Sequence, residues 1–357
     1  MLKKRNTSLD ILRAFAILLV LGRHMPPYPY NNIFIKTLLD AYGRGGWIGV
    51  DLFFVLSGFL ISGLLFAEHK KTGSISFKRF FIRRGLKIYP AFYVMIAATL
   101  MLTALTPHAL LTELFFMQDY AAGLWNHTWS LGVEEKFYLL LPLLFILLSK
   151  INKFKKAPFN VIPVIFIFVS VSCLGLRLFH AHFSPYQHLT HLFPFHLRVD
   201  ALFWGVTISY FYHYHSIPFK IFTQCYKLLL LILGFIFLLP AFLFTLETTP
   251  FIYTGGLTLF YLGSGFILMA FIDDKTSPNV LNKILAYIGA HSYSIYLWHM
   301  PVERGLPYLF HYLPSNYCTY TNVVLTFLIG SIGLGILMSK LIEFPILKMR
   351  DRFFPNR

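Results

Sequence analysis

Apolar residues recur along this chain in runs long enough to cross the hydrocarbon core of a membrane. Hydrophobic residues make up 57% of the sequence and charged residues only 13%, whereas a soluble domain carries roughly 25% charge. A transmembrane helix needs about 20 consecutive apolar residues. We therefore expect an all-α, polytopic membrane helix bundle that forms one domain over residues 1–357. About ten transmembrane helices are expected, at residues 8–25, 46–66, 86–106, 128–149, 159–180, 197–214, 227–245, 251–272, 284–303 and 322–343.

Basic residues are concentrated in short segments between these runs, and the formal net charge is +16. The main clusters are Lys3, Lys4 and Arg5; Lys70, Lys71, Lys78, Arg79, Arg83, Arg84 and Lys87; Lys150, Lys153, Lys155 and Lys156; and Lys348, Arg350, Arg352 and Arg357. Because basic loops stay on the cytoplasmic side of a membrane, this alternation predicts that both termini are cytoplasmic. It also indicates membrane lipids, and no nucleic acid, as partners.

No metal or disulfide framework is predicted. The three cysteines, Cys173, Cys225 and Cys318, lie in different segments without paired spacing. Five histidines gather between residues 180 and 196, but their spacing matches no standard zinc site. We interpret them as solvated residues at the membrane interface.

The first apolar segment carries Asp10, Arg13, Arg23 and His24, although an ionisable group at bilayer depth costs roughly 2.5–3.5 kcal/mol. Arg13 and His24 are eleven positions apart, which places them on nearly the same helix face, about 16 Å apart along the axis. One interpretation is that this helix face lines a water-accessible site where a reaction takes place. The other is that Arg13 snorkels or pairs with Asp10 while His24 is an interfacial residue.

A basic and aromatic segment, residues 77–90, precedes the third apolar run. Arg83, Arg84 and Lys87 recur in it at helical spacing. Anionic lipid would attract such a surface segment at about 1 kcal/mol per basic residue. Alternatively, its guanidinium groups form a clamp for the phosphates of a nucleotide-like donor.

Further charged residues lie within or near the later apolar runs. Glu134 and Glu135 point about 100° apart on a helix, so one is expected to face the bundle interior while the other meets Lys136 or a neighbour. Arg198 and Asp200 lie near the start of the run at 197–214, and His299 lies just before a proline near the end of the run at 284–303.

Together these motifs resemble the acyltransferase-3 family of multi-pass membrane O-acyltransferases. Six segments carry the resemblance in the family's order: residues 9–16 with His24, 53–62, 83–90, 129–138, 198–202 and 294–301. The family's basic motif has two arginines separated by two residues, and here Lys87 takes the second place. A lysine keeps the charge but loses the bidentate fork, so donor binding is expected to be weaker there or to rest partly on Arg83.

The resemblance implies acyl-CoA, most often acetyl-CoA, as donor substrate, with no bound cofactor. It implies a carbohydrate acceptor that is lipid-linked or part of a surface glycan, such as lipopolysaccharide O-antigen, in the bacterial inner membrane. His24, Glu134 and Arg13 would be catalytic, with His24 as general base. Arg83, Arg84 and Lys87 would bind the donor. His299, Asp10, Arg198 and Asp200 are candidates for the acceptor pocket or a proton relay.

Some family members pass the acyl group to a fused extracytoplasmic domain. This chain shows no such segment, so we expect the membrane bundle to acylate the acceptor directly. A transporter or flippase for a lipid-linked glycan is the competing class, because buried charges also line transport pathways. The sequence contains no inverted repeat that would favour transport. Peptidoglycan, a secreted oligosaccharide and a small-molecule scaffold stay as alternative acceptors.

Overall fold

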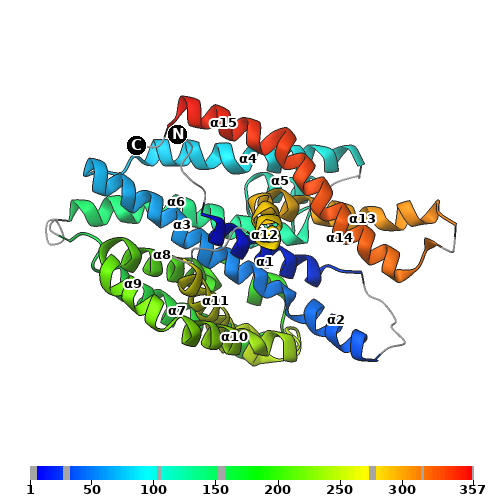
Figure 1. Cartoon of the computed structure of the whole chain (residues 1–357), viewed down its shortest axis with the longest axis horizontal. Helices are drawn as coiled ribbons and strands as arrows, with labels where there is room; N and C mark the ends of the chain where they lie inside the picture. Colours follow the sequence, from blue (N-terminus) through cyan, green and yellow to red (C-terminus); the bar gives the residue numbers. More distant parts are fainter. Residues whose placement is uncertain are drawn as a thin grey trace.

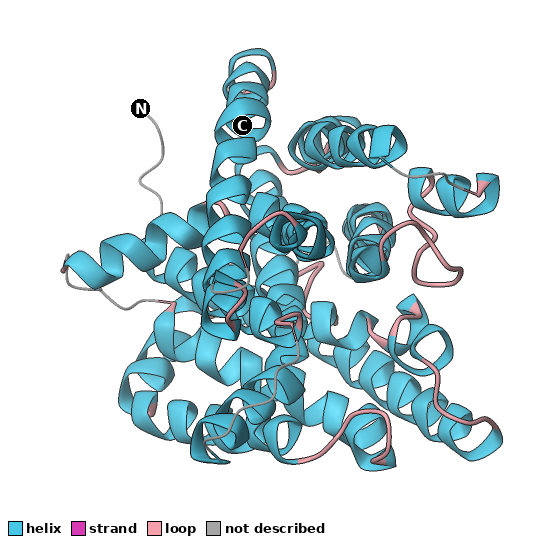
Figure 2. Ribbon diagram, turned by 90° about the vertical axis from the view of Figure 1, so that its right-hand side faces the viewer, coloured by secondary structure: helices cyan, strands magenta, loops and turns pink. Residues whose placement is uncertain are grey.

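In the computed structural model, residues 6–26, 33–102, 106–151, 157–272, 279–314 and 317–355 are described, and every regular element within these ranges is a helix (Figures 1 and 2). The all-α prediction is therefore confirmed for this part of the chain. The basic residues Lys3, Lys4, Arg5, Lys153, Lys155, Lys156 and Arg357 lie outside the described ranges.

The helices follow one another with short connections. They are α1 (Thr7–Arg23), α2 (Ile33–Gly45), α3 (Gly49–Thr72), α4 (Phe77–Leu102), α5 (Pro107–Leu114), α6 (Trp129–Lys150), α7 (Ile162–Phe183), α8 (Val199–Tyr214), α9 (Ser216–Cys225), α10 (Lys227–Leu243), α11 (Leu257–Phe271), α12 (Val280–Ala290), α13 (Ser292–His311), α14 (Tyr320–Met338) and α15 (Phe344–Phe353). Short 3-10 or π turns include η1 (Gly46–Ile48), η2 (Asn126–Thr128), η4 (His188–Leu192), η5 (Phe195–Leu197), η6 (Ile252–Gly256) and η8 (Ser339–Glu343).

Where they are described, the expected apolar segments are largely helical, with two informative differences. The helix α4 begins at Phe77 rather than at residue 86, so the basic segment forms the first turns of the same helix. The expected segment 284–303 is divided between α12 and α13 at His291. Hydrophobic periodicity alone did not reveal this break, because apolar residues continue on both sides of the short polar stretch at residues 291–294.

By length and apolar character, four helical stretches of the described chain suffice to cross a membrane: Ile33–Thr72, Ile162–Phe183, Ile252–Phe271 and Tyr320–Phe353. A fifth is added if α9 and α10, which meet at a 75° bend, form one span. Other helices are shorter or more charged; α1 has 17 residues and includes Asp10, Arg13 and Arg23. The structure thus supports a multi-pass membrane chain, whereas ten crossings and cytoplasmic termini stay predictions.

The helix α3 runs through the middle of the bundle and packs closely along α8 (Figure 1). Two glycines make this approach possible. A Cβ on Gly58 would lie 1.9 Å from the carbonyl oxygen of Leu202, and one on Gly205 would lie 2.1 Å from that of Val55. Small residues at such crossings let membrane helices pack backbone to backbone.

Two buried ion pairs connect α8 to α3 and to α7 near this crossing. Arg198, at the start of α8, donates to the carboxylate of Asp51 on α3 at 2.8 Å. The guanidinium of Arg177 on α7 hydrogen-bonds the carboxylate of Asp200 on α8. All four side chains are at most 1% exposed, so each charge depends on its partner for compensation.

Candidate active site

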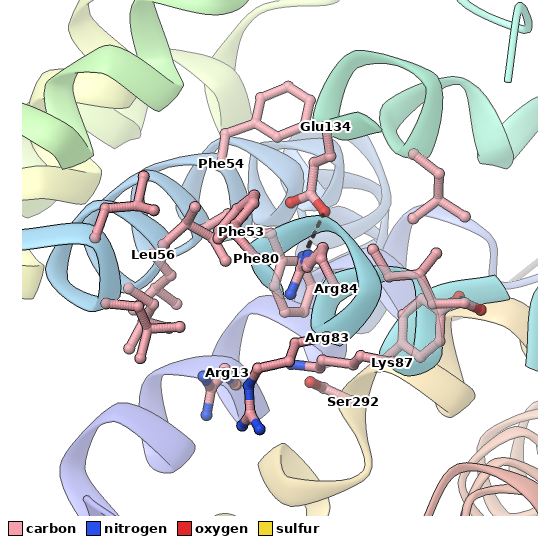
Figure 3. A pocket seen from close by; sticks show the side chains of 18 of the residues that line it. Arg13, Phe53, Phe54, Leu56, Phe80, Arg83, Arg84, Lys87, Glu134 and Ser292 are labelled. Atoms are coloured by element: carbon pink, nitrogen blue, oxygen red, sulfur yellow. Dashed lines mark hydrogen bonds and ion pairs between the residues drawn. The ribbon is translucent and has the colours of Figure 1, made fainter. Parts of the chain in front are cut away.

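A cavity of about 610 Å³ lies between α1, α3, α4, α6, α13 and α15 (Figure 3). Along α3 its wall extends from Val50 to Glu68, which corresponds to about 27 Å at 1.5 Å rise per residue. The six basic side chains in its lining are Arg13, Arg79, Arg83, Arg84, Lys87 and Arg350, and the two carboxylates are Glu68 and Glu134. The cavity is therefore positively charged overall and suited to a polyanion.

The cavity has two chemically different ends. Glu68, Arg79 and Arg350 lie where α3 ends and α4 begins, beside α15, and we call this the basic end. Ser130 and Tyr296 lie toward the start of α3, and we call this the hydroxyl end. Between them the wall is largely apolar, so a long ligand with a charged head and an apolar arm would fit along it.

Arg84 is held in place by a set of polar contacts on the cavity wall. Its guanidinium lies 4.0 Å from the ring centre of Tyr138 and hydrogen-bonds the hydroxyl of that residue. Tyr138 donates in turn to Glu134 at 2.6 Å, and Arg84 lies 3.7 Å from the Glu134 carboxylate. The contacts found for Glu134 thus orient the predicted donor-binding arginine.

The other predicted donor residues converge on the same cavity. Figure 3 shows Arg13, Arg83 and Lys87 close together near Ser292. Arg13 is paired with Asp10 one turn earlier on α1, which is one of the two interpretations that the sequence left open. That pairing leaves the Arg13 side chain in the cavity lining.

The two adjacent glutamates separate as their helical spacing requires. Glu134 faces the cavity, whereas Glu135 accepts a hydrogen bond of 2.9 Å from Tyr89 on α4. Lys136 pairs with Asp119 at 2.6 Å. The carboxylate of Glu134 therefore lies inside the cavity, whereas that of Glu135 contacts Tyr89 behind the cavity wall.

At the hydroxyl end, Ser130 and Tyr296 form a polar layer. Their hydroxyls are 2.7 Å apart, and the Tyr296 hydroxyl also donates to the carbonyl of His127. The ring of Phe53 lies 6.4 Å from that of Tyr296. This layer closes the cavity on the side that leads to the predicted base.

Three histidines gather directly behind this layer. The ring centroids of His24 and His299 are 4.9 Å apart, and those of His127 and His299 are also 4.9 Å apart. His127 and His299 are buried, at 4% and 0% exposed, whereas His24 is half-buried. His24 therefore lies outside the cavity lining, separated from it by Tyr296 and His299.

Backbone carbonyls define the tautomers of two of these histidines. Nδ1 of His24 lies 2.9 Å from the carbonyl of Val20, and Nδ1 of His299 lies 2.7 Å from that of Tyr296. A carbonyl oxygen only accepts, so each Nδ1 carries the proton. Nε2 of His299 lies 3.3 Å from Nδ1 of His24, so the one proton on Nδ1 is shared between the Val20 carbonyl and Nε2 of His299. Nε2 of His24 keeps a lone pair, as a general base requires.

Two sequence neighbours of His24, Arg23 and Pro26, make separate contacts. Arg23 pairs with Glu247 at 2.8 Å. Burial raises the pKa of Glu247, but its backbone amide and Arg23 outweigh that effect and bring the pKa below its usual range. A hollow of about 170 Å³ is lined by residues that include Pro26 and Glu303.

The structure also locates the remaining predicted residues. Arg198 and Asp200 are bound in the buried ion pairs described above and do not line the cavity. His127 was not among the sequence-based candidates, because only the packing of η2 against α13 brings it to His299. Among the described residues, no group of three or more histidine, cysteine or acidic side chains could hold a metal ion.

Comparisons with known proteins agree with the geometry. A family model described as an acyltransferase domain, Acyl_transf_3, matches residues 6–340. A Staphylococcus aureus (strain COL) protein provisionally named an O-acetyltransferase is 32% identical over 325 residues, covering 83% of this chain and 50% of the relative. The peptidoglycan O-acetyltransferase OatA of Listeria monocytogenes (serovar 1/2a, strain EGD-e) is 29% identical over 386 residues, covering 97% of this chain and 56% of the relative. The chain thus spans about half the length of these curated relatives. No solved structure matches it.

Proposed function

The chain belongs to the acyltransferase-3 domain family, and from this premise we propose that it transfers an acetyl group from acetyl-CoA to a carbohydrate hydroxyl. The observation that carries the proposal is the long cavity, which is lined by six basic side chains and has two hydroxyls at one end. Coenzyme A has the matching form, with a phosphorylated nucleotide head and a thin arm that ends in the thioester.

The donor head would bind at the basic end. Arg84, fixed by Tyr138 and Glu134, and Lys87 would contact the diphosphate, with Arg13 contributing positive charge. Arginine binds phosphate oxygens through a planar fork, which makes a fixed guanidinium an effective anchor. The pantetheine arm would follow the apolar wall, so that the thioester reaches Ser130 and Tyr296.

Transfer would take place between the hydroxyl end and the three histidines. Nε2 of His24 removes the proton of the acceptor hydroxyl while its oxygen attacks the thioester carbonyl carbon. The tetrahedral intermediate then collapses, the carbon–sulfur bond breaks, and the coenzyme A thiolate leaves and takes up the proton. His299, which accepts from Nδ1 of His24, keeps the base in its reactive tautomer. General-base assistance contributes roughly 10²–10⁴-fold to the rate.

Because His24 lies behind Tyr296, the hydroxyl layer must open for the acyl group to meet the acceptor. Rotation of the Tyr296 side chain, away from Ser130 and His127, is the smallest movement that opens it. Direct transfer is favoured over a covalent relay, since the hydroxyls of Ser57 and Ser130 in the cavity lining contact tyrosine hydroxyls and not a base directly.

We place the basic end in the cytoplasm, since Arg79, Arg83 and Arg350 from α4 and α15 lie there and basic segments stay on that side. This orientation goes with ten membrane crossings, cytoplasmic termini and a bacterial inner-membrane location. The acceptor is a cell-surface glycan. The name of the Listeria relative favours peptidoglycan, and lipopolysaccharide O-antigen is the alternative.

The His24→Ala variant tests this function. Cells that carry it should lose O-acetyl signals from surface glycan in proton NMR, while the purified variant still binds coenzyme A with wild-type affinity. His182→Ala, at an exposed histidine of α7, is the matched control and should keep both properties. Separate analysis of peptidoglycan and lipopolysaccharide identifies the acceptor. Wild-type O-acetylation in the His24→Ala strain would refute the assignment, and a chain that moves glycan across vesicles without acetylating it would instead be a flippase.

A further inference from the structure

The last helix of the described chain contributes to the cavity although it lies beyond the region that the family model matches. That region ends at residue 340, whereas α15 covers Phe344–Phe353. Figure 1 shows α15 lying beside α4, and Arg350 from α15 is part of the cavity lining. The basic end is therefore completed by a residue that the family resemblance does not assign.

One carboxylate oxygen joins Arg350 to Arg83. Oδ1 of Asp351 accepts from Nη2 of Arg83 at 3.0 Å, and from Nε and Nη2 of Arg350 at 3.0 and 2.8 Å. Arg83 also donates to the carbonyl of Phe354. Both guanidinium side chains are mostly buried, at 15% and 16% exposed, while Asp351 is 45% exposed. Two arginines are thus held side by side at the cavity mouth.

We propose that Arg83 and Arg350 form a phosphomonoester subsite that binds the 3′-phosphate on the ribose of the donor. This proposal rests on the proposed function, in which coenzyme A is the donor. A phosphomonoester carries close to two negative charges and three acceptor oxygens at neutral pH, enough to engage two forked guanidinium groups. Asp351 holds the two side chains together through its Oδ1 when no phosphate is present.

The orientation of coenzyme A along the cavity brings its 3′-phosphate to Arg83 and Arg350. The thioester has to reach Ser130 and Tyr296 at the hydroxyl end. Tyr296 lies beside Phe53, which is about 22 Å along α3 from Glu68. The nucleotide must therefore lie at the basic end. Arg84 directly follows Arg83, and Lys87 lies about one turn further along α4. Arg84 also lies 3.7 Å from Glu134, one turn from Ser130 on α6, so the diphosphate of the donor would lie between the 3′-phosphate and the thioester.

Binding of coenzyme A and of 3′-dephospho-coenzyme A to the full-length protein in detergent tests the subsite. The wild type should bind coenzyme A roughly 10- to 100-fold more tightly, as expected for charge-assisted contacts to one phosphate. Arg350→Ala should weaken coenzyme A binding to the level of the dephospho compound and leave the affinity for that compound unchanged. Arg350→Lys, which keeps the charge but loses the fork, should give an intermediate ratio.

Arg352→Ala is the control, because Arg352 lies on the same helix, stacks near Phe353 and is absent from the cavity lining. It should keep the wild-type ratio. Equal affinity of the wild type for both compounds would overturn the subsite while leaving the proposed function intact. Equal weakening of both compounds by Arg350→Ala would also overturn it. A wild type that binds neither compound would refute the proposed function itself.

Discussion

Replacing Tyr138 by phenylalanine should weaken donor binding although Tyr138 does not line the cavity. The hydroxyl of Tyr138 accepts from Arg84 and donates to Glu134 at 2.6 Å. Hydrogen bonds to charged groups contribute about 1.5–3 kcal/mol each. Part of that loss is recovered because Arg84 and Glu134, already 3.7 Å apart, can pair directly.

A net loss equal to one such bond corresponds to a roughly 10- to 100-fold higher Kd for coenzyme A. The assay is equilibrium binding of radiolabelled coenzyme A to the purified variant, together with KM and kcat for the donor. We expect KM to rise and kcat to change little, because the ring under Arg84 is preserved while its fixed orientation is lost.

Tyr261→Phe is the matched control, since Tyr261 is also buried and its hydroxyl contacts Ser170 away from the cavity. It should affect thermal stability without changing the Kd for coenzyme A. A Kd for Tyr138→Phe within about twofold of the wild type, at an unchanged Tm, would show that Arg84 does not depend on this hydroxyl to bind the donor.

Three other outcomes follow from the packing and the charge of the cavity. Gly58→Ala should lower the Tm strongly, because the added Cβ would meet the carbonyl oxygen of Leu202. The expected loss of folding stability is about 1–3 kcal/mol or more. Gly175→Ala should be tolerated, because its added Cβ would have no neighbouring group within 4 Å. Asp51→Asn should destabilise the fold by about 3–5 kcal/mol, because Arg198 would be left buried without its counter-charge. Thermal unfolding measures this loss, and a Tm shift no larger than that of Gly175→Ala would contradict the prediction. Coenzyme A binding should weaken as salt rises, since screening reduces the attraction of a polyanion to the basic residues; a salt-independent Kd would contradict this charge-based account.

The sequence was sufficient for the helical class and for the convergence of Arg13, Arg84 and Lys87 on one cavity. Helical spacing and the family resemblance carry that information, because both are local properties of the chain. Periodicity also separated Glu134 from Glu135 correctly, with Glu134 inside the cavity and Glu135 behind its wall.

The other features of the site depend on contacts between residues far apart in the sequence, and sequence patterns did not reveal these contacts. His127 lies in a short turn before α6, and only the approach of α13 brings it to His299. Arg350 appeared as one of several basic tail residues that fit the positive-inside pattern equally well, and only the contact of α15 with α4 selects it. Arg198 and Asp200 looked like site residues because buried charge commonly marks function in membranes, but each is paired with a charge on a neighbouring helix.

The closure of the cavity at Ser130 and Tyr296 has a consequence for the energy supply of the cell. An open aqueous route across the bundle would let protons and small ions cross the membrane down their electrochemical gradient. Each elementary charge that crosses would dissipate about 2.3 kcal/mol of stored free energy per 100 mV of membrane potential. Two hydroxyls 2.7 Å apart act as a seal at that point. In the proposed transfer, an opening made by one side chain would admit a two-carbon group more readily than a long fatty chain, so the same contact would also limit the size of the group transferred.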